Sequence, residues 1–384
     1  MNELISLGRL LWDNAEPGFF ETETHKILST RFKDLGFTIK EFKHIPGFIA
    51  TIDGDFKTKP IAVISDMDAL PLPGDPKNRY IHSCGHHVQM TALYGTAVLL
   101  KKEDPELLKK ISFIAIPAEE YIDFDKREKL INNNKISLMS GKLELIKRGI
   151  FTSPKIVVST HSAPFKSKKF ISSVLNMAGF EVMHFSFQGK TSHGGAAPHL
   201  GVNAQNAASL FLQASAFLRE SFDEEKHIRI HPILKLDNNQ SVNLIPEHVT
   251  VETYVRGADT KAVKKVVEQL SKAAEGCAEA IGAKVEITIK QGYKPFTADP
   301  VLHNMIKKTA EDLNIKFIEE QYSSASSDVG DISQLKPTVM LGLPGVNGKF
   351  HNPDFRVTDE EAAYIFPAKF LAKYLRKVAD SKGL

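Results

Sequence analysis

The sequence contains few cysteines, little excess charge of either sign and no long apolar run. Cys84 and Cys277 are the only cysteines in 384 residues, which argues against a disulfide framework and leads us to expect a reducing, cytoplasmic setting. A net charge of +3 is too small to indicate binding to nucleic acid or to an anionic membrane. No apolar stretch approaches the length of a membrane span, and charged residues near the N-terminus argue against a secretory signal.

The order of apolar patterns predicts an α/β domain that a smaller α+β domain interrupts. Buried strands are expected at 61–65, 111–116 and 156–160, with helices between them, which is typical of a mostly parallel central sheet flanked by helices. From Met177 the pattern changes to strand, helix, strand, strand, helix, strand, the order of a ferredoxin-like unit with an antiparallel sheet. Helices and strands alternate again from about Gly292. We expect a catalytic domain at 1–176 and 291–384, and an inserted domain at 177–290.

Potential metal ligands occur where the predicted strands end, the usual position of a site on an α/β sheet. Five side chains share this placement: Cys84, His86, Glu120, His161 and His351. Cys84 and His86 are expected on a loop directly before a helix at 89–102, and His161 is expected just after a strand. Thiolate, imidazole and carboxylate suit zinc, manganese, cobalt or nickel better than calcium or magnesium. Five ligands exceed the needs of one tetrahedral ion but fit two ions, with the Cys84 sulfur or a water as bridge.

Glu119 stands beside one of these ligands and is the natural general base. It would take a proton from a metal-activated water and pass it to a leaving amine. Each residue taken alone also has a structural interpretation, since a buried cysteine is often only a small apolar residue and a glutamate pair often faces solvent. Their joint occurrence favours a metal-dependent hydrolase. A closed structural metal site is disfavoured, because such sites use four Cys or His ligands without a neighbouring free carboxylate.

Several motifs, in the same order over nearly the whole chain, resemble one family. They are SDMDALP at 65–71, HSCGHH at 82–87, PAEE at 117–120, Thr160-His161, GKTSHGGAAPHLGVNA at 189–204, SVNLIPE at 241–247, SSDVGD at 326–331 and the His351 loop. The sequence resembles the metal-dependent amidohydrolases of the aminoacylase and carboxypeptidase group. Within that group it is similar to the branch of auxin-conjugate, hippurate and aminobenzoyl-glutamate hydrolases, in which a cysteine replaces the usual bridging aspartate.

The resemblance implies a role for each matching residue. Cys84 would bridge two divalent ions, Mn or Zn with Co or Ni as alternatives, and the remaining ligands would be His86, Glu120, His161 and His351. Glu119 would be the general acid/base, and Asp68 would orient a ligand.

Three further roles fall in the inserted domain, which the resemblance implies to be a lid and dimerisation domain. His193 would reach the active site of a neighbouring subunit and stabilise the oxyanion. Asn243 and Arg256 would hold the substrate's carboxylate, which a guanidinium does through two parallel hydrogen bonds. Structural alternatives remain: Asn243 as a turn residue, Arg256 as a surface charge and His193 as an exposed loop residue.

The expected function is cleavage of the amide bond of an N-acyl amino acid or a similar carboxylate-bearing conjugate by a cytoplasmic homodimer. One alternative is a dipeptidase or aminopeptidase on the same scaffold, which needs an acidic residue for a free α-amine. Another is a catalytically silent metal-binding dimer, against which the intact Glu119 argues. His87 and Gln89 depart from the family, where much of the branch has aspartate and histidine, and we expect them to affect the pocket beside the metals.

Overall fold

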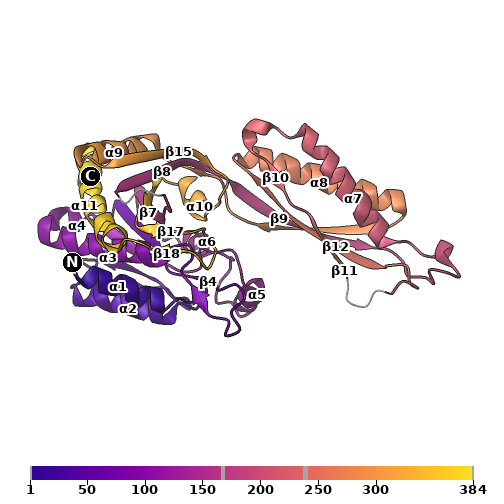
Figure 1. Cartoon of the computed structure of the whole chain (residues 1–384), viewed down its shortest axis with the longest axis horizontal. Coiled ribbons are helices and arrows are strands. Elements are labelled where there is room, and N and C mark those ends of the chain that lie inside the picture. Colours follow the sequence, from indigo (N-terminus) through magenta and orange to yellow (C-terminus); the bar gives the residue numbers. More distant parts are fainter. Residues whose placement is uncertain (1, 166–168, 237–240, 383–384) are drawn as a thin grey trace. The chain divides into compact units, whose positions relative to one another are not determined.

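The computed structural model describes residues 2–165, 169–236 and 241–382, and its chain forms two compact units (Figure 1). The first unit comprises Met1–Asn176, Thr297–Tyr322 and Ser327–Leu384, and the second comprises Met177–Phe296 and Ser323–Ser326. The chain therefore leaves the first unit after Asn176 and returns to it through Thr297, with a short excursion at Ser323–Ser326.

A sheet in the order β1-β2-β6-β3-β7-β16-β8-β14, with β15 paired to β8, forms the centre of the first unit. Its strands are β1 (Thr38–Glu41), β2 (Phe48–Thr51), β3 (Ile61–Asp66), β6 (Ile111–Ile116), β7 (Ile156–Ser162), β8 (Phe170–Met177), β14 (Phe296–Thr297), β15 (Lys316–Ser323) and β16 (Thr338–Leu343). Strands β6, β3, β7 and β16 run parallel, whereas β1, β2 and β8 pair antiparallel. Every residue of β3 and β6 is buried, as expected for parallel strands with both faces covered. The predicted mostly parallel sheet is confirmed.

Helices pack around this sheet: α1 (Asn2–Asp13), α2 (Thr22–Asp34), α3 (His86–Glu103), α4 (Pro105–Leu108), α5 (Phe124–Asn132), α6 (Gly141–Lys147), α9 (Pro300–Asp312), α10 (Val329–Ser333), and α11 (Phe366–Lys382) after a π-helical turn at Glu361–Ile365. Helix α3 contacts α1, α11 and β3, and most of its residues are buried. Short strand pairs, β4 (Leu70–Pro71) with β5 (Tyr80–Ile81) and β17 (Val346–Asn347) with β18 (Arg356–Val357), lie in loops.

Three features of this unit are not evident from the local sequence pattern. The polar stretch after Glu120 forms two helices, α5 and α6, and not one, because Asn134 adopts a left-handed conformation (φ 54°) and the Ser140 side chain caps α6. The helix expected from residue 89 begins at His86. Strand β8 was not predicted, since its serines and asparagine weaken the strand pattern.

The second unit is an antiparallel sheet with two helices on one face. Strands β9 (Gly179–Gln188), β10 (Arg229–Ile230), β11 (Ile233–Leu236), β12 (His248–Gly257) and β13 (Lys284–Gln291) pair in the order β10-β12-β9-β13, with β11 also on β12. Helices α7 (Ala204–Leu218) and α8 (Thr260–Ile281) pack on this sheet; short 3-10 turns lie at Pro198–Leu200, Arg219–Ser221 and Glu224–Lys226. Burial alternates along β12, because only one face is covered.

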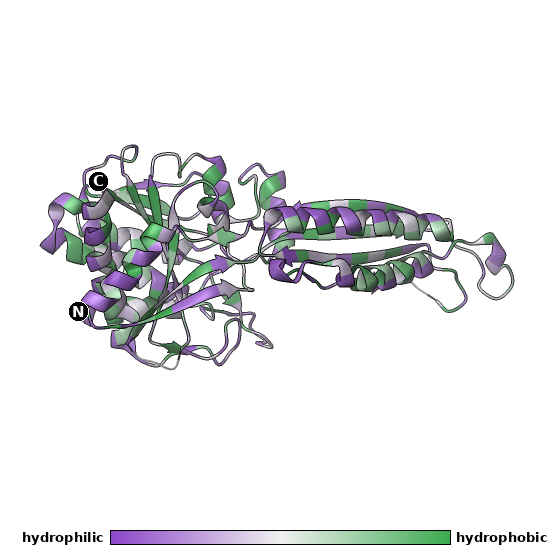
Figure 2. Ribbon diagram, turned by 90° about the horizontal axis from the view of Figure 1, so that it is seen from above, coloured by the Kyte–Doolittle hydropathy of each residue, from purple (hydrophilic) through white to green (hydrophobic). Residues whose placement is uncertain are grey.

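The helices of the second unit carry both hydrophilic and hydrophobic residues (Figure 2), as expected for helices with one face packed on a sheet. Phe185, Phe187 and Phe211 are fully buried between its sheet and helices. Among the described residues, no helix combines the length and apolarity that crossing a membrane requires.

Candidate metal centre

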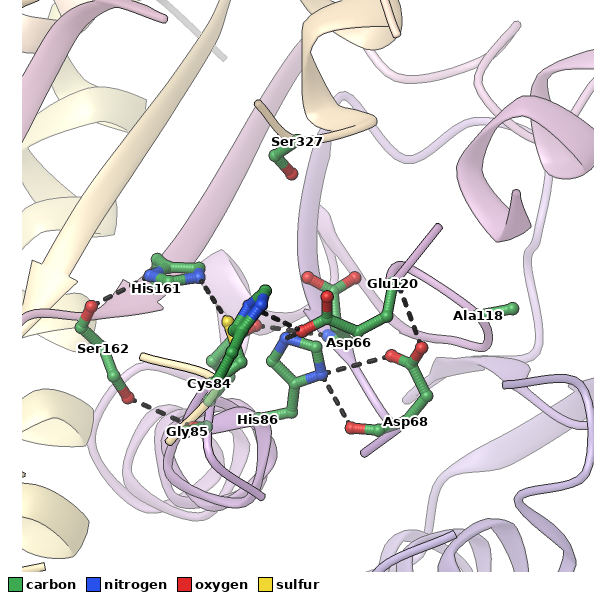
Figure 3. A network of polar contacts seen from close by, with 12 residues as sticks. Asp66, Asp68, Cys84, Gly85, His86, Ala118, Glu120, His161, Ser162 and Ser327 are labelled. Atoms are coloured by element: carbon green, nitrogen blue, oxygen red, sulfur yellow. Dashed lines mark hydrogen bonds and ion pairs between the residues drawn. The ribbon is translucent and has the colours of Figure 1, made fainter. Parts of the chain in front are cut away.

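The structure brings the five predicted ligands together at one end of the central strands. Figure 3 shows four of them, Cys84, His86, Glu120 and His161. Cys84, His86 and His161 form one group of converging ligand atoms, and Cys84, Glu120 and His351 form another. Within each group the atoms lie within 4.8 Å of one another. The Cys84 Sγ lies 3.3 Å from His161 Nε2, and Glu120 Oε1 lies 3.5 Å from His351 Nε2. Cys84 belongs to both groups, as a bridging ligand would.

A left-handed glycine sets the positions of the first two ligands. Gly85 has φ 80° and is the N-cap of α3, and a Cβ on it would lie 2.0 Å from Ser162 Oγ. His86 is therefore the first residue of the helix rather than a loop residue as predicted. His161 also differs slightly from the prediction, since it lies within β7 and not after it.

Asp68 holds two of the ligands at once. Its Oδ1 lies 3.1 Å from His86 Nδ1, and its Oδ2 accepts a hydrogen bond of 3.0 Å from the Glu120 backbone N–H. His86 Nδ1 also lies 2.8 Å from the Asp68 carbonyl oxygen. An outer carboxylate in this position would fix the ring orientation of a metal-binding histidine. The role that the resemblance implies for Asp68 stays a prediction.

The donor atoms fit divalent ions. His86 Nε2 and Glu120 Oε1 are buried without a hydrogen-bond partner among the described residues, and they face each other at 4.0 Å. Buried polar atoms without partners are costly, and cations bound by the two groups would satisfy both. His161 Nδ1 is 2.9 Å from the Ser162 carbonyl oxygen, an arrangement that keeps the proton on Nδ1 and leaves Nε2 free to bind a metal.

The electrostatics of the ligands depend on burial. Burial and the charge of His86 lower the pKa of His161 to about 4, which keeps this imidazole in the neutral form that metals bind. Burial raises the pKa of Cys84 well above its usual range, and the Glu120 carboxylate raises it further. A bound cation reverses this balance, because a coordinating thiol loses its proton.

Glu119 lies beside the ligands among buried charges. Burial raises its pKa well above the usual range, and the charges of Glu120 and Asp328 raise it further. The sequence analysis missed Lys142, a fully buried lysine. Its ammonium contacts Asp66 and lies 2.6 Å from Asp328 Oδ1.

The three predicted residues of the inserted segment all lie in the second unit. His193 Nδ1 accepts hydrogen bonds from the backbone N–H groups of Gly195, at 3.1 Å, and Ala196, at 3.0 Å. The ring proton of neutral His193 is therefore on Nε2, which makes this atom a donor. His193 and Asn243 belong to adjoining loops, since the Gly194 N–H donates to the Asn243 carbonyl oxygen at 2.7 Å.

Arg256 is the second-last residue of β12. Its guanidinium carbon lies 5.0 Å from the ring centroid of Tyr254 and 5.6 Å from that of Phe180, and its Nη1 donates to the Ser324 carbonyl oxygen at 2.8 Å. The substrate-binding roles of Arg256 and Asn243 stay predictions.

His87 and Gln89, the two departures from the family pattern, are fully buried. The His87 ring packs edge-on against Trp12, with centroids 4.9 Å apart, and Gln89 Oε1 accepts a hydrogen bond from the Asp66 N–H at 3.3 Å. Both side chains belong to the packing behind the ligands, so any effect on substrate choice must pass through neighbouring residues.

Comparisons with known proteins point to one family. The model of peptidase family M20/M25/M40 matches residues 62–377. N-acetyl-L-cysteine deacetylase of Bacillus subtilis (strain 168) is 25% identical over 99% of this chain and 89% of its own length. Hippurate hydrolase of Campylobacter jejuni is 24% identical over 97% of each chain. The crystal structure of the Bacillus subtilis YXEP protein, described as a dinuclear metal-binding peptidase from the M20 family, superposes with a TM-score of 0.77 at 22% identity, covering 99% of this chain and 98% of that one.

Proposed function

We propose, from the premise that this chain belongs to peptidase family M20/M25/M40, that it hydrolyses the amide bond of N-acyl amino acids. Membership confirms the predicted family and makes the chain an amidohydrolase of the metallopeptidase class. Relatives over nearly its whole length include an N-acetyl-L-cysteine deacetylase and a hippurate hydrolase. These names support a substrate that joins a small acyl group to an amino acid with a free carboxylate.

One observation carries the proposal: donors of the right chemistry converge, and two of their buried atoms, His86 Nε2 and Glu120 Oε1, have no hydrogen-bond partner in the described part of the chain. Cys84, His86, Glu120, His161 and His351 would hold two divalent ions, and manganese or zinc fits these ligands best, with cobalt or nickel as alternatives. Such ions polarise a carbonyl and lower the pKa of a shared water.

The chain's own residues would move the protons and hold the substrate. Glu119 takes the proton of the attacking water and returns it to the leaving amine. His193 donates its Nε2–H to the developing oxyanion. Arg256 pairs with the substrate's carboxylate through two N–H groups, and Asn243 adds a further hydrogen bond.

The organisation of the chain supports a further part of the proposal. The second unit runs β9, α7, β10, β11, β12, α8, β13. We propose that it is a ferredoxin-like lid and dimerisation domain inserted into the catalytic domain, with β10 and β11, which both pair with β12, together in the place of one strand. The working enzyme would be a cytoplasmic homodimer, and the low cysteine content supports this compartment.

Hydrolysis by metal-stripped protein, with Mn or Zn added back, tests this function. The panel contains acetyl, benzoyl and aminobenzoyl amino acids together with dipeptides. We expect metal-dependent release of amino acid that Glu119→Gln lowers by about 10²–10⁴-fold, with the metal content of this isosteric variant unchanged. Release from dipeptides alone would favour a dipeptidase. Tight metal binding without turnover on any substrate would contradict the proposed hydrolase and favour a silent metal-binding dimer.

A further inference from the structure

The turn that presents Glu119 and Glu120 is strained. Ala118, just before them, has φ 56°, a left-handed conformation that is unfavourable for a residue with a Cβ. Strain of this kind persists only where contacts with the surrounding residues hold the backbone in that conformation. The contacts that hold this turn therefore fix the position of Glu119 and Glu120.

Glu21 supplies the first of these contacts. It is fully buried, and its Oε1 accepts a hydrogen bond of 2.8 Å from the Ala118 N–H. Glu21 is also the N-cap residue of α2, yet its side chain caps nothing there. Glu16 does this instead, because its carboxylate accepts the backbone N–H groups of Glu23 and Thr24 at 3.2 and 2.8 Å. The helix does not need the Glu21 carboxylate, and the Ala118 turn uses it.

Arg127 supplies the second contact, from helix α5. Only 1% of this residue is exposed, and its guanidinium donates to the carbonyl oxygens of Glu120 and Met139 while lying over the Phe19 ring. Burial raises the pKa of Glu21 well above its usual range, and the charge of Arg127 opposes this rise.

Backbone groups complete the support of the turn. The Gly141 N–H donates to the Ala118 carbonyl oxygen at 3.0 Å, and a Cβ at Gly141 would lie 1.6 Å from the Pro117 oxygen. Four backbone groups of the turn are therefore hydrogen-bonded. The Ala118 N–H and C=O bond to Glu21 and Gly141, and the Glu120 N–H and C=O bond to Asp68 and Arg127.

We propose that Glu21 and Arg127 are positioning residues that hold the strained Ala118 turn and thereby set Glu120 for metal binding and Glu119 for proton transfer. The inference rests on the proposed function of Glu119 and Glu120. Neither positioning residue touches the substrate or the ligand atoms, so their loss acts through the placement of the two glutamates. The ligand group without Glu120, formed by Cys84, His86 and His161, does not depend on this turn.

Metal titration of the stripped full-length protein, followed by equilibrium dialysis, tests the proposal. Glu21→Asp shortens the carboxylate away from Ala118, and Arg127→Lys cannot reach two carbonyl oxygens as a guanidinium does. In each variant we expect one equivalent of Mn or Zn to bind about 10–100-fold more weakly than in the wild type, the usual effect of losing an outer contact. The other equivalent should bind as before, and kcat should fall while KM stays close to the wild-type value.

Two further variants serve as controls. Glu21→Gln keeps an oxygen for the Ala118 N–H, so it should retain metal binding and kcat within a few-fold. Glu16→Gln weakens the cap of α2 and should lower the melting temperature without a selective loss of one metal equivalent. Circular dichroism checks that every variant is folded at the assay temperature.

The outcomes separate the two proposals. Wild-type binding of both equivalents by Glu21→Asp and Arg127→Lys would overturn the positioning role, whatever the activity. General destabilisation would weaken the binding of both metal equivalents equally and lower the melting temperature at the same time. That result would also overturn the positioning role. If the wild type binds two ions but hydrolyses nothing, the proposed function fails, and the selective loss of one equivalent still decides the role of Glu21 and Arg127.

Discussion

At the scale of single residues, Lys142 is the most deeply buried cation near the candidate site. Its ammonium compensates Asp66 and Asp328, and all three side chains are buried. The Ser140 hydroxyl and the Lys142 backbone N–H also donate to Asp328 Oδ2. Removing one partner of such a network leaves buried charge without compensation, which costs far more than losing a surface pair.

We expect Lys142→Met to lower the free energy of unfolding by about 3–5 kcal/mol, because two carboxylates lose their counter-charge. Urea unfolding of the metal-free protein measures the change. Lys109→Met is the matched control, since Lys109 pairs with Glu106 on the surface and such a pair contributes less than about 1 kcal/mol. Similar losses for the two variants would show that the Lys142 network adds nothing beyond an ordinary surface pair.

The sequence motifs contain the candidate ligands and Asp68, which contacts two of them, but not the other supporting residues, Glu21, Arg127 and Lys142. Cys84, Glu120 and their fellow ligands stand in recognisable motifs at the ends of strands. Glu21 and Lys142 stand in no such motif, because their structural roles depend on partners 97 and 76 positions away in the sequence. A lysine or glutamate in a polar stretch is usually exposed, and nothing local distinguishes one that folding buries.

At the scale of elements, the start of helix α3 decides where two ligands lie. The apolar pattern predicted the helix but placed its beginning three residues late, because His86 and His87 are not apolar and their burial is a tertiary effect. The left-handed Gly85 is the actual start signal. It lets Cys84 remain outside the helix while His86 is already inside it.

Gly85→Ala should therefore disrupt the centre as well as the helix. A Cβ at Gly85 meets Ser162 at 2.0 Å in addition to the left-handed backbone, whereas Gly74 has a similar φ of 73° with nothing within 4 Å. Gly74→Ala should cost only the conformational term of about 1–2 kcal/mol. We expect Gly85→Ala to cost more than this and to abolish tight binding of Mn or Zn, as measured by thermal unfolding and metal titration. Equal effects of the two variants would contradict the role given to the contact with Ser162.

At the scale of the whole molecule, the chain separates the candidate metal centre from the proposed oxyanion donor. The five ligands and Glu119 belong to the first unit, and His193 belongs to the second. The sequence predicted two blocks because the apolar periodicity changes at their boundaries, near Met177 and Gly292. It could not establish which subunit's His193 serves a given site, since that depends on assembly and not on local pattern.

Mixing two inactive variants tests whether His193 serves the active site of its own subunit or that of the partner. If His193 serves the partner's site, as proposed, a heterodimer of Glu119→Gln and His193→Ala contains one complete site, formed by the Glu119 of one subunit and the His193 of the other. Random exchange of equal amounts should then restore about a quarter of the wild-type sites, because half the dimers are mixed and each has one complete site of two. If His193 serves its own subunit, every site in the mixture lacks one of the two groups. The measurement is amino-acid release after exchange, with mixed dimers counted by native mass spectrometry. Mixed dimers without restored activity would overturn the shared site and favour action of His193 within its own chain.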